Sequence, residues 1–170
     1  MKTVFLLRHA KSSWNNPGLA DHERPLNGRG NKSAKAMGEY AAHEGLKPGI
    51  VFSSTSQRTR ETIAGFAKGL DETLDIEFMD ELYLASPDTI LQAIQTTPAD
   101  VNSVMIVAHN PGTHYAALEL IKSADANDRE ALEYNFPTAA LAEYQFEADQ
   151  WTGVRFGQGT LIRFILPRQL

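Results

Sequence analysis

The hydrophobic residues of the chain fall into short runs separated by segments with the periodicity of helices. Residues 4–7, 50–52 and 104–108 are nearly continuous apolar runs. Such runs are typical of strands in a parallel sheet that is covered by helices on both faces. Residues 76–79 alternate between apolar and polar side chains, which predicts a fourth strand nearer an edge.

Three segments between these runs have helical patterns. Residues 31–44 and 57–70 carry apolar and small side chains at helical spacing. Ser86, Pro87 and Asp88 form a helix-start signal, with an N-cap, a first-turn proline and a first-turn acid. The alternation of strands and helices over the first 120 residues therefore predicts an α/β sandwich.

A further helix is predicted after the last of the three buried runs. Asn110 and Pro111 repeat the helix-start signal, and Tyr115, Leu118 and Ile121 continue an apolar face. We expect this helix to pack against the sheet along that face.

The chain changes character after residue 122. Residues 123–135 are polar and acidic, which favours a solvated surface segment or an irregular helix. Residues 139–146 and 154–166 are rich in strand formers and can pair as a hairpin. We expect one domain over residues 1–170: a three-layer α/β/α sandwich with a mainly parallel sheet and a C-terminal antiparallel strand pair.

Composition excludes several classes of protein. The 170 residues include 16 Lys and Arg against 21 Asp and Glu, a formal net charge of -5, which argues against nucleic acid or an anionic membrane as a partner. The absence of cysteine excludes disulfides and thiolate nucleophiles, and it fits a reducing compartment. The first apolar run is too short for a signal peptide, so we expect a cytoplasmic protein.

The candidate chemistry lies where the predicted strands end. Arg8 and His9 follow the first strand, His109 follows the strand at 104–108, and Arg58 lies in the opening turn of the helix after residues 50–52. Because ligands of open α/β sheets bind beyond the carboxyl ends of the strands, we expect these four side chains to meet.

A cluster of two arginines and two histidines suits a phosphoryl group. Guanidinium groups bind phosphoryl oxygens in pairs, and helix N-termini add backbone N–H donors. Two arginines can balance a phosphate dianion, so the pattern demands no metal and no other cofactor. A neutral imidazole is a competent nucleophile, which allows covalent transfer to a histidine followed by hydrolysis.

Each of these residues taken singly has a structural explanation. A lone histidine at a strand end is commonly a hydrogen-bonded structural residue, and an isolated arginine is commonly a surface charge. His22, His43 and His114 are interpreted as non-catalytic. His114 follows His109 by five positions, a spacing that does not place two metal ligands on one helical face.

Four segments, in this order, resemble the motifs of the histidine phosphatase superfamily, the phosphoglycerate mutase-like proteins. More specifically, they resemble its SixA-type phosphohistidine phosphatase branch. One motif, Leu-Arg-His-Ala-Lys-Ser-Ser-Trp, starts at Leu7, and Ala-His-Asn-Pro-Gly starts at Ala108. The four segments are residues 7–14, 21–30, 53–62 and 107–112.

The resemblance implies a phosphatase that removes the phosphoryl group from phosphohistidine on a protein, without metal or cofactor, through a covalent phosphohistidine intermediate. His9 would accept the phosphoryl group, and Arg8, Arg58 and His109 would hold it. Many members of the superfamily also carry a glutamate proton donor in an inserted helical segment. Here residues 78–86 form only a short connection, and Glu81 is the candidate donor, with Asp80 beside it.

The short connection also predicts an open, shallow pocket, which suits a side chain on a protein surface. The resemblance implies a phosphorylated protein as partner, such as an acidic His-containing phosphotransfer domain. Lys11, Arg24 and Arg29 would supply local positive charge, and Arg24 either approaches the phosphate or caps its loop. Two alternatives stay open: a phosphatase of small esters such as sugar phosphates, and a non-catalytic module that binds phosphorylated partners.

Overall fold

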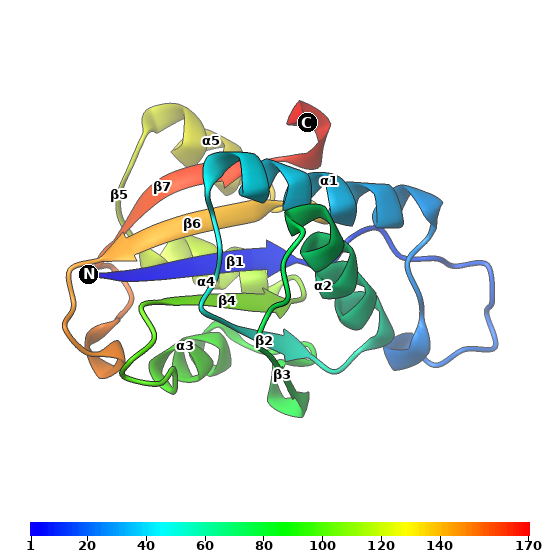
Figure 1. The fold of residues 1–170 in the computed structure, drawn as a ribbon, viewed down its shortest axis with the longest axis horizontal. Helices are drawn as coiled ribbons and strands as arrows, with labels where there is room; N and C mark the ends of the chain where they lie inside the picture. Colours follow the sequence, from blue (N-terminus) through cyan, green and yellow to red (C-terminus); the bar gives the residue numbers. More distant parts are fainter.

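A seven-stranded sheet forms the centre of the computed structural model, which describes residues 1–170 (Figure 1). The strand order across the sheet is β3-β2-β4-β1-β6-β7-β5. The strands are β1 (Lys2–Arg8), β2 (Ile50–Ser54), β3 (Ile76–Met79), β4 (Ser103–Ala108), β5 (Ile121–Ala124), β6 (Leu141–Phe146) and β7 (Gly159–Ile165).

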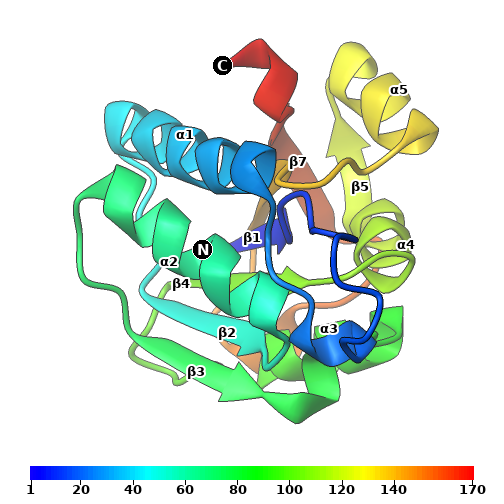
Figure 2. The ribbon, with the colours of Figure 1, turned by 90° about the vertical axis from the view of Figure 1, so that its right-hand side faces the viewer.

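Helices cover both faces of this sheet (Figure 2). On one face, Phe5 of β1 belongs to an apolar cluster with Met37 of α1 and Phe66 of α2. On the other, Val4 belongs to a larger cluster that includes Ile90 of α3 and residues of α4 and α5. The three-layer sandwich predicted from the sequence is thereby confirmed.

The helices are α1 (Gly28–Glu44), α2 (Gln57–Leu70), α3 (Pro87–Gln95), α4 (Gly112–Leu120) and α5 (Ala126–Tyr134). Short 3-10 helices lie at η1 (Asp21–Glu23), η2 (Asp80–Leu82), η3 (Trp151–Gly153) and η4 (Pro167–Gln169).

The three continuous apolar runs form the adjacent strands β2, β4 and β1, which pair in parallel. The alternating run forms β3, at the edge of the sheet as its pattern predicts. The register sets Arg8 opposite Ala108, and Ser53 of β2 opposite Val107. The carboxyl ends of these three strands therefore lie side by side.

Helix α1 begins three residues earlier than the apolar pattern predicts. The Asn27 side chain accepts a hydrogen bond from the Gly30 N–H and caps the helix at Gly28. At α3 the predicted start is confirmed, because Ser86 accepts from the Thr89 N–H.

Helices α1 and α2 pack side by side on one face of the sheet (Figure 1). A Cβ added at Gly38 of α1 would lie 2.0 Å from the Phe66 carbonyl oxygen, and one at Gly69 of α2 would lie 2.0 Å from that of Lys35. The absence of side chains at these positions is what allows the two helix backbones to touch.

The expected course of α4 is wrong in three respects. The Asn110 side chain does not cap the helix but donates from Nδ2 to the Phe136 carbonyl oxygen, 2.9 Å away. Tyr115 is exposed, and Ile121 has left the helix to begin β5. This strand pairs in parallel with β7, with Ile121 opposite Gly159, and the gain of sheet hydrogen bonds ends the helix.

The polar stretch after residue 122 contains the regular helix α5. Asp125 starts it by accepting a hydrogen bond from the Asn127 N–H. The C-terminal antiparallel pair is confirmed as β6 and β7, although β7 begins at Gly159 rather than at Val154. Val154 instead packs in the core after η3. None of the helices combines the length and apolar character required to cross a membrane.

Candidate active site

The ends of β1 and β4 bring two histidines together. His9 follows β1, and its backbone N–H donates to the carbonyl oxygen of Ala108, 3.2 Å away. His109 follows β4, and the centroids of the two imidazole rings are 5.3 Å apart. Both side chains are buried.

Arg58 reaches the same place from the first turn of α2. Ser56 caps this helix, and the guanidinium Cζ of Arg58 is 6.0 Å from the centroid of the Tyr83 ring. That ring meets the His109 ring edge-on, at a centroid distance of 5.4 Å.

Arg8 completes the group, and its Nη1 donates to the Phe136 carbonyl oxygen at 3.0 Å. Burial, and then the positive charge of Arg58, lower the pKa of Arg8. The structure therefore brings together all four predicted residues, which we call the four-residue cluster: Arg8, His9, Arg58 and His109.

Two further residues of this site, Asp21 and Tyr83, were missed in the sequence analysis. Nη1 of Arg58 donates to the Asp21 backbone oxygen at 2.7 Å, and Nη2 donates to its carboxylate Oδ2 at 3.0 Å. The Tyr83 hydroxyl donates to the same carboxylate oxygen. The hydrogen bond from Tyr83, followed by those from Arg24 and Arg58, holds the pKa of Asp21 well below its usual range.

Sequence signals for these two residues are weak. Asp21 is the first residue of the second family-like segment, residues 21–30. The likeness of the whole segment gives this carboxylate no particular role. Tyr83 follows η2 and belongs to no apolar period or motif. Only the folding of two loops over the strand ends brings both side chains to Arg58.

Arg24 holds the loop between β1 and α1. Its Nε donates to the Ser13 carbonyl oxygen at 3.2 Å, and Nη1 donates to Asp21 Oδ1 at 2.9 Å. The exposed Trp14 ring covers the guanidinium, with Cζ 3.3 Å from the ring centroid. Of the two roles left open for Arg24, the structure shows the loop contacts, while its charge still contributes to lowering the pKa of His9.

Glu81, the candidate proton donor, is exposed in η2, and its side chain makes no hydrogen bond or ion pair. The neighbouring Asp80 accepts from the Thr55 hydroxyl at 2.7 Å. The carboxylate that contacts the four-residue cluster is that of Asp21.

His22 and His114 lie outside the four-residue cluster. His22 contacts the Thr55 hydroxyl at 2.9 Å, and its ring meets that of Tyr83 edge-on. His114 Nε2 is 2.6 Å from the Leu132 carbonyl oxygen, which ties α4 to α5. No three His, Cys, Asp or Glu side chains of the chain are arranged to hold a metal ion.

Burial keeps both histidines of the cluster neutral near pH 7. It lowers the pKa of His9 to about 4, with the charges of Arg8 and Arg58 acting in the same direction and a hydrogen bond to Ala10 opposing them. It also lowers the pKa of His109 to about 3, helped by the positive charge that His9 carries when protonated and then by that of Arg58. A neutral imidazole keeps a lone pair for chemistry.

Hydrogen bonds determine which ring nitrogens are free. His9 Nδ1 lies 2.8 Å from the Ala10 carbonyl oxygen, so this nitrogen carries the proton and Nε2 keeps the lone pair. His109 Nε2 lies 2.8 Å from the Ser54 hydroxyl, which accepts from the Ser56 N–H and has no other acceptor for its own proton. We therefore assign the Ser54 proton to the bond with His109 Nε2, which leaves the His109 proton on Nδ1.

Two donor nitrogens of the cluster have no acceptor. Nε of Arg8 and Nδ1 of His109 are buried without a hydrogen-bond partner. Buried polar atoms in native proteins are nearly always paired, so these two nitrogens are available to a ligand. An oxyanion supplies the acceptors that these nitrogens need.

The free energy of unfolding is expected to rise with pH between about 4 and 6.5 because of His9 and His109. In that range the unfolded chain protonates both histidines, whereas the lowered pKa values keep them neutral in the folded protein. Each histidine adds a slope of up to about 1.4 kcal/mol per pH unit. Stability is thus lost as the pH falls below 6.5, which urea denaturation at pH 5 and pH 7 measures.

A double variant provides the control for this slope. His9→Gln with His109→Gln should flatten it, and His43→Gln, on the exposed side of α1, should not. An equal slope in the double variant and the parent protein would contradict the buried, neutral state of the two rings.

A strand-end cluster of two arginines and two histidines is the arrangement expected of a phosphoryl-transfer enzyme that uses a histidine nucleophile. In this cluster, His9 carries the free lone pair on Nε2.

Comparison with known proteins defines the family. The sequence model of the histidine phosphatase superfamily (branch 1) matches residues 4–83, which include His9 and Arg58. An uncharacterized protein of Mycobacterium tuberculosis (strain H37Rv) is 33% identical over 164 residues, 95% of this chain and 100% of its own length.

Two solved structures support the same family. The protein of Agrobacterium tumefaciens assigned as the phosphohistidine phosphatase SixA is 32% identical, with a TM-score of 0.82 over 98% of each chain. The protein of Nakamurella multipartitia with the same assignment is 26% identical, with a TM-score of 0.83 over 98% of this chain and 96% of that one. The chain belongs to the histidine phosphatase superfamily and, within it, to the SixA-type branch. It is therefore a phosphatase of that superfamily.

Proposed function

We propose that the protein removes the phosphoryl group from phosphohistidine on another protein, and that His9 carries it as a covalent intermediate. The observation that supports this most directly is the pair of buried histidines at the strand ends, whose ring centroids are 5.3 Å apart. The contact of His9 Nδ1 with the Ala10 carbonyl oxygen assigns the free lone pair to Nε2, and His109 Nδ1 has no hydrogen-bond partner. The SixA assignment of the relatives from Agrobacterium tumefaciens and Nakamurella multipartitia supports the choice of phosphohistidine.

The reaction proceeds in two displacements. His9 Nε2 attacks phosphorus in line, a new N–P bond forms, and the P–N bond to the substrate imidazole breaks, with the electron pair leaving on the substrate nitrogen. Water then attacks the phosphohistidine at His9, which releases inorganic phosphate and restores the neutral imidazole. Dividing the transfer in this way replaces one difficult step by two easier ones.

The arginines and His109 stabilise the transition state. Arg8 and Arg58 neutralise charge that spreads over the equatorial oxygens of the transferring group. The Nδ1 proton of His109 donates to one of these oxygens. Because these donors are held in place by Phe136, Asp21 and Ser54, they need little rearrangement when the charge develops.

Asp21 links phosphate binding to proton supply. Without a ligand its carboxylate accepts hydrogen bonds from Tyr83, Arg24 and Arg58, which keep it ionised. A phosphoryl group that engages Arg58 brings negative charge towards Asp21, which raises the pKa of this carboxyl group. Asp21 lies nearer to the cluster than the exposed Glu81, but its carboxylate can donate a proton only after the bound phosphoryl group has raised its pKa. A protonated imidazole leaves readily without such a donor.

The test is a rapid-quench experiment with a peptide that carries radiolabelled phosphohistidine. We expect an acid-labile, base-stable label on His9, and turnover of phosphohistidine well above that of sugar phosphates. Label on another residue would disprove the proposed intermediate, and equal turnover of sugar phosphates would favour an ester phosphatase. Tungstate binding without turnover of any phosphorylated compound would indicate a non-catalytic binding module.

A further inference from the structure

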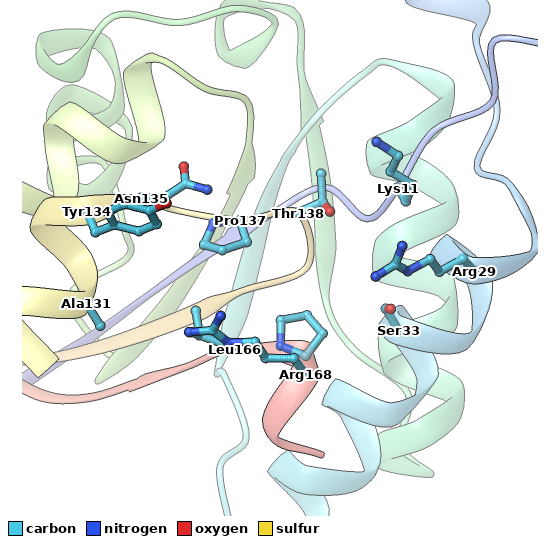
Figure 3. A pocket seen from close by; sticks show the side chains of 11 residues that line it. Lys11, Arg29, Ser33, Ala131, Tyr134, Asn135, Pro137, Thr138, Leu166 and Arg168 are labelled. Carbon is cyan, nitrogen blue, oxygen red and sulfur yellow. The ribbon is translucent and has the colours of Figure 1, made fainter.

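A groove beside the proposed active site carries three cationic side chains (Figure 3). It lies between the first turn of α1, the end of α5 and the C-terminal η4, and encloses a cavity of about 360 Å³. A cavity of this size is large enough to receive several side chains of a ligand. We call it the cationic groove; the lining residues that matter here are Lys11, Arg29, Tyr134, Pro137, Thr138 and Arg168.

The charge of the cationic groove is not neutralised by the protein. Lys11, Arg29 and Arg168 are exposed, and none of them takes part in an ion pair or a side-chain hydrogen bond. No Asp or Glu is among the residues that line the groove. In a chain with a formal net charge of -5, three unpaired cations around one cavity make a local positive field.

One wall separates the cationic groove from the four-residue cluster. Pro137 and Thr138 line the groove, and the preceding Phe136 carbonyl oxygen accepts from Arg8 Nη1 on the other side. The Ala139 N–H donates to the backbone oxygen of His9 at 3.0 Å. A chain that presents a phosphorylated side chain to His9 can therefore extend into the groove.

We propose that the cationic groove binds an acidic segment of the phosphorylated protein, next to the phosphohistidine in sequence. This inference rests on the proposed function. Carboxylates of the segment pair with Arg29 and Arg168 across the groove and with Lys11 at its rim. Tyr134, 90% exposed, supplies an aromatic surface for an apolar side chain of the same segment.

The proposal gives a phosphatase with a net negative charge a means of binding an acidic segment. The net charge of -5 repels an acidic segment at long range, so recognition of such a segment has to come from local complementarity. The groove provides that complementarity without placing additional charge on the phosphoryl-binding cluster. Its contribution should appear in the KM of a peptide substrate and should weaken with salt.

The experiment compares phosphohistidine peptides that differ only in three Glu or three Gln residues, placed on either side of the phosphohistidine. In one of the two placements, we expect the parent protein to hydrolyse the Glu peptide with a kcat/KM about tenfold above that of the Gln peptide. Several exposed ion pairs, each with a modest contribution, account for this factor. The double variant Arg29→Gln, Arg168→Gln should lose the preference through KM, with unchanged hydrolysis of phosphoramidate. The charge-matched double variant Lys122→Gln, Arg155→Gln, outside the groove, should retain it.

The outcomes separate this inference from the proposed function. Equal hydrolysis of Glu and Gln peptides in both placements, or a preference that survives in the groove variant, would overturn the docking proposal alone. Failure to hydrolyse any phosphohistidine peptide would overturn the proposed function itself. Unchanged phosphoramidate hydrolysis shows that the groove variant is folded.

Discussion

Replacement of His9 by Gln is expected to lower kcat for a phosphohistidine peptide by roughly 10³-fold or more. Loss of a covalent nucleophile removes the first displacement, and what remains is the weak effect of the positioned cations on attack by water. Gln keeps an amide that can replace the hydrogen bond from His9 Nδ1 to the Ala10 carbonyl oxygen. Steady-state kinetics at neutral pH measures the loss.

Two measurements show whether this loss is chemical. Tungstate should still bind to the His9→Gln variant, since Arg8, Arg58 and His109 are unchanged. His43→Gln is the matched control, because His43 is exposed on α1 and lies outside the four-residue cluster. Its kcat should stay within a few-fold of the parent value. A His9→Gln enzyme with more than a tenth of the parent activity would place the nucleophile elsewhere.

Replacement of Arg58 by Gln is expected to lower kcat/KM by about 10²–10³-fold. Removal of one preorganised donor to a developing oxyanion costs this much in comparable sites, and Arg58 also carries a full charge. The buried guanidinium is already held by two hydrogen bonds to Asp21, so little entropy is lost when it binds the phosphoryl group. Kinetics with the phosphohistidine peptide and with phosphoramidate should show similar losses.

Arg60 provides the control for Arg58. It lies two residues further along α2, exposed, with its guanidinium over the Phe78 ring and Nε bonded to the Thr55 carbonyl oxygen. Arg60→Gln should leave kcat/KM within about threefold of the parent value. Arg58→Lys should fall between the parent and Arg58→Gln, because lysine keeps the charge and loses the paired geometry. A loss in Arg58→Gln no greater than in Arg60→Gln would remove Arg58 from the proposed mechanism.

The position of the four-residue cluster could be predicted because it depends on strand order more than on side-chain detail. Continuous apolar runs identify buried parallel strands, and parallel strands end at a common edge. Arg8 and His9 directly follow one such run and His109 follows another. The register of β1 and β4, with Arg8 opposite Ala108, then needs no further information to bring the histidines together.

The partners of that cluster could not be predicted in the same way. Asp21 and Tyr83 lie in η1 and after η2, where no periodic pattern relates residues 62 positions apart. The early end of α4 also depended on a distant segment, since β5 forms only because β7 offers it a hydrogen-bonding edge. Local sequence preferences do not report such long-range contacts.

By itself, the sequence determined the layered α/β fold, the edge of the sheet that carries the chemistry, and the identity of the four residues gathered there. These features follow from apolar periodicity and from residues adjacent to strand ends, which are local properties of the chain. Only the tertiary structure decided that Asp21 holds Arg58, that burial keeps His9 and His109 neutral, and that Lys11, Arg29 and Arg168 share one groove. The physical reason is that burial, electrostatic coupling and cavity shape arise from contacts between segments far apart in the chain.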